Sequence, residues 1–189
     1  MQHPAKIIAN YYSTHQILPE QTIAFMEYVL MSLCNEWIKI VMYGIFFSLL
    51  GKSALFWFVL AIMYSIRWFS GGMHCKTFWG CFGISLAVFS ALVYISPILP
   101  CFPIIFSIIL IIIGGISINR VPYTPPIRPI KKHRTICLLR CFYITMLIAW
   151  IIFLNLAPLP TQYVSSGFYT LFSQVIQLLI PHQERSLSS

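Results

Sequence analysis

The chain has 189 residues, of which 59% are hydrophobic and 8% are charged. A soluble domain carries about 25% charged residues, so this composition excludes an ordinary soluble protein, and the long apolar blocks are typical of an integral membrane protein. The net charge is +8 and all four acidic residues are glutamates, which excludes any mechanism that needs an aspartate.

The N-terminal segment 1–35 is predicted to be peripheral or interfacial. Its first 22 residues contain no long apolar core and no cleavage site for a signal peptide, so we expect the chain to insert through its first spanning helix. Residues 23–35 are apolar apart from Glu27, a pattern that suits an amphipathic helix in the membrane interface.

Six apolar runs follow, and glycine or proline residues separate most of them. They are 37–50, 53–69, 82–99, 104–118, 136–157 and 163–180. A bilayer needs about 20 helical residues, so the first helix is expected to begin near Ser32 or earlier. The last run contains several serines, which leaves open a sixth span or an interfacial helix. We therefore predict an all-α, polytopic membrane bundle in a single domain, with about six transmembrane helices or with four plus interfacial helices.

Charge alternates along the connections between these runs. The connections 70–80 and 119–135 are basic, whereas 97–103 and 158–162 carry no charge. The positive-inside rule then places the basic connections and both termini in the cytoplasm, with Cys101 alone among the six cysteines outside. A basic loop of this kind is expected to touch membrane lipids, and we expect no nucleic-acid partner.

The stretch from Arg67 to Cys81 differs from plain spanning sequence. Gly71 and Gly72 are expected to end a helix, and His74 then precedes Cys81 by seven residues. A nucleophilic cysteine needs a nearby base or a setting that stabilises its thiolate. On one continuous helix the two side chains would lie about 10.5 Å apart along the axis. The chain must therefore bend between them if they act together.

We expect His74 on the loop and Cys81 near the start of the next helix, where the helix dipole favours a thiolate. Any acid that orients the histidine must be a glutamate, and Glu36 and Glu27 are the candidates at that membrane boundary. Pairing with a basic residue such as Lys39 is the favoured alternative role for them, and a dyad without an acid stays open. Backbone N–H groups near the cysteine could stabilise an oxyanion.

The pattern formed by Arg67, Gly71, Gly72, His74 and Cys81 resembles the signature of the accessory gene regulator protein B family. Members of this family are bacterial membrane endopeptidases that process the precursors of cyclic autoinducing peptides in quorum sensing. The chain is also similar to the family in its length, its several apolar runs and its basic, proline-rich loop.

This resemblance implies that Cys81 is the nucleophile and His74 its base. It implies cleavage of the C-terminal tail of a pro-peptide at the cytoplasmic face of the bacterial plasma membrane. An acyl-enzyme thioester then closes to a thiolactone or lactone ring. A homodimer is expected and no cofactor. The supporting or substrate-binding residues would be Arg67, Ser70, Gly71, Gly72, Glu36 and Glu27.

Two alternatives remain open. A non-enzymatic membrane protein, such as a peptide transporter or an export partner, would use Arg67, His74 and the glutamates to line a path and would tolerate loss of Cys81. A zinc enzyme would need a ligand set, and the nearest candidate is His133, Cys137 and Cys141, spaced by four residues on one helix face. No fourth ligand accompanies them, so no metal is expected.

Overall fold

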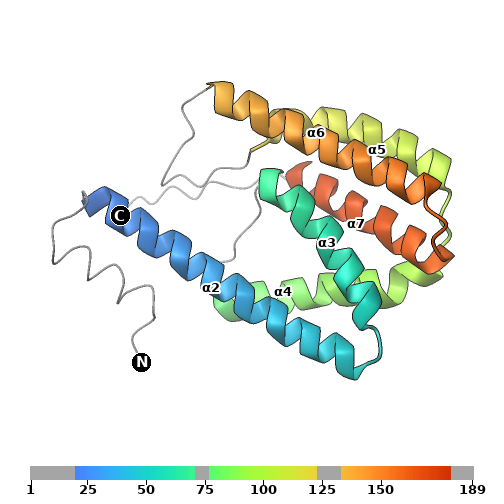
Figure 1. The fold of residues 1–189 in the computed structure, drawn as a ribbon, viewed down its shortest axis with the longest axis horizontal. Coiled ribbons are helices and arrows are strands. Elements are labelled where there is room, and N and C mark those ends of the chain that lie inside the picture. The colour runs from blue at the N-terminus through green and yellow to red at the C-terminus, as the bar shows by residue number, and fades with distance from the viewer. Residues whose placement is uncertain (1–19, 71–76, 123–132, 180–189) are drawn as a thin grey trace. The chain divides into compact units, whose positions relative to one another are not determined.

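The computed structural model describes residues 20–70, 77–122 and 133–179, and these contain helices and no β-strand (Figure 1). The α-helices are α2 (Glu20–Leu49), α3 (Ser53–Ser70), α4 (Phe78–Ser90), α5 (Pro103–Ser117), α6 (His133–Leu156) and α7 (Thr161–Leu179). Three short turns complete them: the π-helical η1 (Ala91–Ile95) and the 3-10 turns η2 (Ser96–Ile98) and η3 (Ile118–Arg120). The predicted all-α class is confirmed.

The chain divides into two compact units, Met1–Gly51 and Lys52–Ser189. The first unit contains α2, a single helix of 30 residues. The segments predicted separately as an interfacial helix and a first span are therefore parts of one helix, because neither glycine nor proline interrupts residues 20–43. Gly51 has a φ of 66°, a left-handed conformation that glycine adopts without strain, and it forms the predicted turn after α2.

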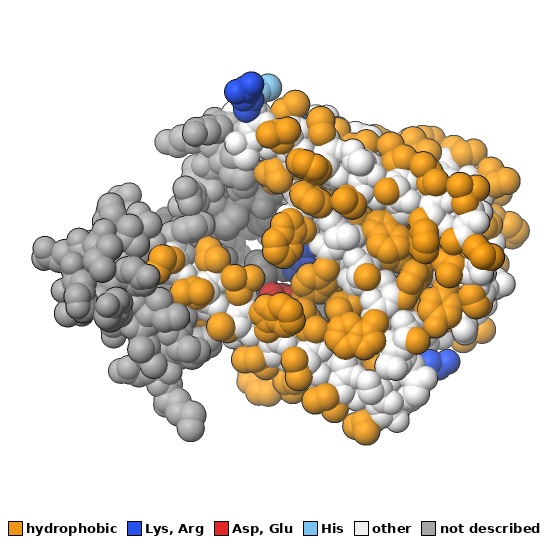
Figure 2. Space-filling view, viewed as in Figure 1, with side chains coloured by type: hydrophobic (Ala, Val, Ile, Leu, Met, Phe, Trp, Pro, Cys, Tyr) orange, Lys and Arg blue, Asp and Glu red, His pale blue; other side chains and the backbone are white. Residues whose placement is uncertain are grey.

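Helices α4, α5 and α6 of the second unit are apolar on nearly every side but bury only a narrow stripe. On α6 the buried residues are Tyr143, Leu147, Ile151 and Leu154, which recur at the spacing of one helix face. The remaining apolar side chains are exposed, and Figure 2 shows them over most of the described surface with few charges among them. Lipid is the environment that suits such a surface. Five of the described helices are long and apolar enough to cross a membrane, which supports the predicted polytopic bundle.

Helix α7 is more polar than the other helices of this unit and, like α3, is largely enclosed by protein. It packs against α3, α5, α6 and η2, and Figure 1 shows it alongside α3. Its buried residues are Ser165, Ser166, Gly167, Phe168, Thr170, Leu171, Gln174 and Val175. Because protein rather than lipid surrounds this helix, it does not need an apolar surface on every side. Helix α7 is not among the five helices apolar enough to cross a membrane by themselves, and its packing makes it an inner helix of the bundle.

Two helices begin earlier than their apolar runs predicted. Helix α4 begins at Phe78 rather than at residue 82, and α6 begins at His133 rather than at residue 136. Helix α6 begins with polar residues, which a search for apolar runs leaves out, and in α4 Gly80 separates the aromatic residues Phe78 and Trp79 from the apolar run. Residues 133–135, predicted to belong to the basic loop, are therefore helical.

The helices of the second unit alternate in direction, as the charges of their connections predicted. Figure 1 shows the C-terminal ends of α3, α5 and α7 at the same end of this unit as the N-terminal ends of α4 and α6. Arg67, Arg120 and Arg134 lie on the helix turns at this end, which we call the basic end. The connections 99–102 and 157–160 lie at the opposite end and carry no charge.

Candidate functional site

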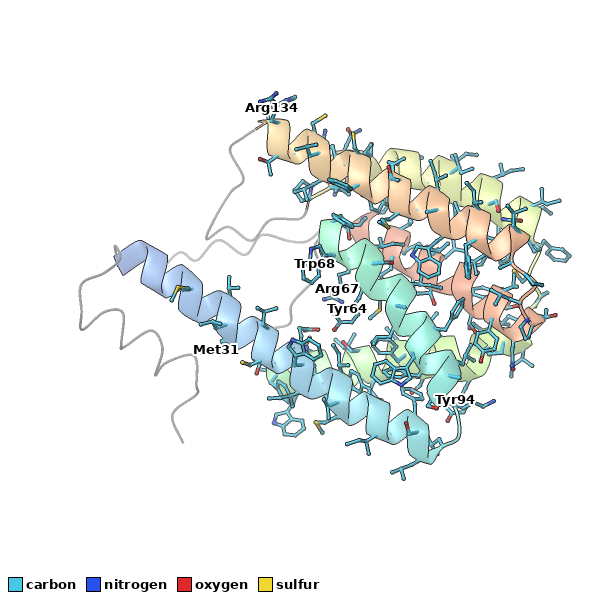
Figure 3. All side chains as sticks on the ribbon, viewed as in Figure 1. Met31, Tyr64, Arg67, Trp68, Tyr94 and Arg134 are labelled. Carbon is cyan, nitrogen blue, oxygen red and sulfur yellow. The ribbon has the colours of Figure 1, made fainter. Side chains whose placement is uncertain are left out.

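Most of the predicted site residues belong to the last turn of α3, the start of α4 and the connection between them. Arg67 is in the last turn of α3, and Ser70 is the final, buried residue of that helix. Tyr64, Arg67 and Trp68 lie close together at this end of α3 (Figure 3). Cys81 is the fourth residue of α4. Three predicted residues, Gly71, Gly72 and His74, lie outside the described residues.

Thr77 sets the position of Cys81 by capping α4. Its backbone is extended, with φ −119° and ψ 144°, and its hydroxyl accepts a hydrogen bond from the Gly80 N–H at 3.2 Å. The Cys81 N–H donates to the Thr77 carbonyl at 3.1 Å. Residue 80 must be small, because a Cβ atom there would lie 2.8 Å from the Thr77 hydroxyl. The extended Thr77 interrupts any helix between His74 and Cys81. The separation of about 10.5 Å along one continuous helix therefore does not apply to this pair.

The first turn of α4 leaves a limited set of backbone donors near the cysteine. The N–H groups of Gly80 and Cys81 are already bonded to Thr77. The N–H groups of Phe78 and Trp79 have no acceptor within the helix, as is general for the first residues of a helix. Helical side chains lean towards the N-terminus, so the Cys81 thiol, on a residue that is 9% exposed, leans over this turn.

Aromatic side chains surround the start of α4. Phe78 and Phe82 are stacked with their ring centroids 6.2 Å apart, and Trp79 meets Phe82 edge-on at 6.0 Å. Trp79 is 72% exposed, and Trp68 at the end of α3 is 79% exposed. Exposed tryptophans at helix ends are typical of the interface between membrane and water. The end of α3 and the start of α4, which carries Cys81, each have one such tryptophan.

The C-terminal part of α4 is anchored to the bundle by a widened turn. The Ser96 N–H bonds to the Ala91 carbonyl, five residues earlier, which is the pattern of a π-helix. Pro97 follows and lacks an N–H, so the regular helix cannot continue there. The Ser96 hydroxyl donates to the Ser166 hydroxyl on α7 at 3.0 Å. The apolar run predicted this helix but gave no sign of the π turn or of its polar anchor.

The structure describes the side chain of one of the two glutamate candidates, Glu36. Glu36 forms an ion pair with Lys39, three residues along α2, and the Lys39 side chain is almost fully buried. Glu36 therefore has the basic partner that the sequence favoured for it, and this pair keeps both charges compensated. The side chain of Glu27 lies outside the described part of the structure.

The possible metal ligands do not form a site. His133, Cys137 and Cys141 are all exposed on α6. Across residues 20–70, 77–122 and 133–179, no group of three or more His, Cys, Asp or Glu side chains could hold a metal ion.

The chain is similar to known proteins along most of its length. A family model described as accessory gene regulator B, AgrB, matches residues 5–178. A protein of Clostridium beijerinckii described as "Putative AgrB-like protein" is 27% identical over 164 residues, which cover 86% of this chain and 80% of that relative. No solved structure matches the chain.

Proposed function

This chain belongs to the accessory gene regulator B family, and from that premise we propose that it is a membrane cysteine endopeptidase that cleaves and cyclises an autoinducing-peptide precursor. Membership itself connects the chain with the peptide processing of this quorum-sensing system. The proposal adds the chemistry: removal of the C-terminal tail of the pro-peptide and ring closure through a thioester. Cys81 and His74 are the proposed catalytic pair.

In the first step, His74 takes the proton of the Cys81 thiol, and the sulfur attacks the carbonyl carbon of one peptide bond of the precursor. His74 then gives the proton to the leaving nitrogen, and the C-terminal tail departs with a free amino group. The N-terminal part stays attached to Cys81 as a thioester. In the second step, a thiol or hydroxyl of the peptide attacks the thioester carbonyl and loses its proton. The bond to Cys81 breaks, the thiol is restored, and a thiolactone or lactone ring is released.

The observation that carries this proposal is the start of α4. The Thr77 cap interrupts the helix between the two proposed catalytic residues and leaves the N–H groups of Phe78 and Trp79 without helical acceptors. Donors aimed at the developing oxyanion are a large source of catalysis in acyl transfer. Cys81 is also well shielded from solvent, and a shielded thioester favours ring closure over hydrolysis because little water reaches it.

The remaining predicted residues receive supporting roles in this proposal. Arg67 and Ser70 would bind substrate or fix the loop, and Gly71 and Gly72 would allow its bend. Glu36 would act through its pair with Lys39 rather than as a third catalytic residue. The partners are the pro-peptide, membrane lipids and a second copy of the chain. We place the protein in the bacterial plasma membrane, with the basic end in the cytoplasm.

Co-expression with a candidate precursor, followed by mass spectrometry, tests this function. A suitable candidate is a short peptide encoded by a neighbouring reading frame, with an amphipathic start, a central cysteine or serine and an acidic tail. We expect Cys81→Ala and His74→Ala to accumulate uncut precursor. Cys137→Ala, which changes an exposed cysteine on α6, should process it normally. The active protein should also yield an acyl-enzyme that hydroxylamine removes, and chelators should leave processing unchanged. Normal processing by Cys81→Ala would favour the non-enzymatic export partner.

A further inference from the structure

One face of α7 carries a row of polar residues through the interior of the second unit. The row consists of Ser166, Thr170, Ser173, Gln174 and Gln177, at helical spacings that keep them on one side. Ser166, Thr170 and Gln174 are buried. Polar groups inside a membrane protein are expensive unless they are bonded or serve a function, so each of them needs a partner.

The hydroxyls of this row have partners. The Ser166 hydroxyl accepts from Ser96 at 3.0 Å. The Thr170 hydroxyl donates to the Ser166 carbonyl at 2.6 Å, and the Ser173 hydroxyl donates to the Thr170 carbonyl at 2.8 Å. These bonds lie within α7 or between α7 and η2, so they account for the row's first three members as parts of the fold.

Gln174 is different. Its residue is 4% exposed, yet its side-chain Nε2 has no hydrogen-bond partner. Among the described residues one other buried side-chain atom shares this condition, the Ser165 hydroxyl, which lies against the Cys101 thiol. A buried amide donor without an acceptor destabilises the fold, and such a group is retained more readily where a ligand supplies the acceptor.

The position of Gln174 along α7 indicates the ligand. Phe58 on α3 meets Tyr163 on α7 at 5.3 Å, and the two helices run in the same direction (Figure 1). About 16 Å further along both helices, Gln174 comes level with the last turn of α3. Ile66, directly before that turn, and Val175 of α7 belong to the same buried cluster. Gln174 therefore lies near the point where α3 ends at Ser70, directly before the predicted catalytic loop.

We propose that Gln174 is a substrate-binding residue whose carboxamide holds a backbone peptide group of the precursor beside the end of α3. This inference rests on the proposed function. A carboxamide carries a donor and an acceptor side by side, and a peptide group offers the complementary pair. A peptide drawn into the membrane interface loses its water, so it needs protein donors and acceptors in return. Because neither group is charged, the contact accepts different residues at that position of the peptide.

Kinetics of Gln174→Met test this role, because methionine has similar length and no hydrogen-bonding amide. The full chain in lipid nanodiscs would be assayed with a synthetic copy of the precursor identified in the co-expression experiment. We expect KM to rise about tenfold, as for one lost hydrogen bond in a dry site, with kcat changed less than about threefold. The melting temperature should stay the same or rise, since the unpaired donor is gone. Thr170→Val, which removes a hydroxyl bonded within α7, is the matched control and should leave KM within about twofold.

A binding measurement separates this inference from the function on which it rests. In a Cys81→Ala background, a fluorescent copy of the same peptide should bind with a Kd about tenfold higher when Gln174 is also methionine. Equal Kd values with and without Gln174 would overturn the inference alone. A melting temperature that falls together with the weaker binding would also overturn it, because that result assigns Gln174 to the fold. Normal cleavage by Cys81→Ala would instead remove the proposed function.

Discussion

Cys101 is a cysteine whose surroundings differ from those of the proposed nucleophile. It lies in the connection between η2 and α5, partly buried, and its thiol interacts with the Ser165 hydroxyl. Burial raises the pKa of the Cys101 thiol above its ordinary value, and the Ser165 interaction opposes part of this rise. A thiol with a raised pKa holds less thiolate at any pH below that pKa, and the thiolate is the reactive form. The Cys101 thiol is therefore expected to be unreactive at neutral pH.

Alkylation of a variant that retains Cys101 alone tests this description. At neutral pH the Cys101 thiol should react with a small maleimide more slowly than a cysteine in a short peptide does. As the pH rises, the Cys101 rate should continue to increase beyond the pH at which the rate of the peptide cysteine becomes constant. Ser165→Ala removes the interaction that lowers the pKa, so it should move this point to still higher pH. A Cys101 rate that follows the peptide at every pH would contradict the assignment.

At this scale the sequence revealed the residues whose chemistry is unusual. His74 and Cys81 stand out by type and spacing, and the pairing of Glu36 with Lys39 follows from their separation of three residues on a helix. The Thr77 cap and the burial of Gln174 were missed. A threonine before an apolar run is a recognisable cap signal. For Gln174 no such signal exists, because a single sequence does not show which polar residue of a helix faces protein.

Among the elements, α4 depends most on a single residue at its start. Thr77→Ala removes the acceptor of the Gly80 N–H, and loss of an N-cap costs about 0.5–2 kcal/mol of helix stability. We expect faster amide hydrogen exchange over residues 78–81 and slower precursor processing, since Cys81 lies at the end of that turn. Thr77→Ser keeps the hydroxyl and should restore both. Unchanged exchange in Thr77→Ala would show that the cap does not hold this turn.

The existence of the spanning helices was predictable because lipid selects long apolar runs regardless of tertiary contacts. The exceptions are elements whose surroundings are protein. The apolar run of α7 is weak because its polar row faces inwards. The π turn η1 forms next to Pro97, where Ser96 contacts Ser166. Close contacts are equally invisible in a sequence: a Cβ on Gly167 would lie 2.5 Å from Leu154 on α6. These features depend on partners far along the chain.

The helices of the second unit face two different environments, lipid on the outside and protein on the inside. Its outer helices present apolar side chains for lipid, while the inner helix α7 carries polar groups that lipid would exclude. Helix α3 ends and helix α4 begins at the basic end, where α7 also ends (Figure 1). A peptide substrate that meets the site at the membrane interface would thus find polar groups from α7 without crossing the hydrocarbon layer.

The side of the membrane on which each connection lies is the remaining test at this scale. If α7 crosses the bilayer as an inner helix, the chain after Leu179 lies on the same side as the connection 123–132, and the connection 157–160 lies on the other side. Alkaline phosphatase, which folds only outside the cytoplasm, should be active when fused within 157–160 and inactive when fused after residue 179 or within 123–132. Green fluorescent protein fused after residue 179 should give the reverse result. Phosphatase activity at the C-terminus would mean that α7 does not cross, and its polar row would then need water rather than a substrate as its partner.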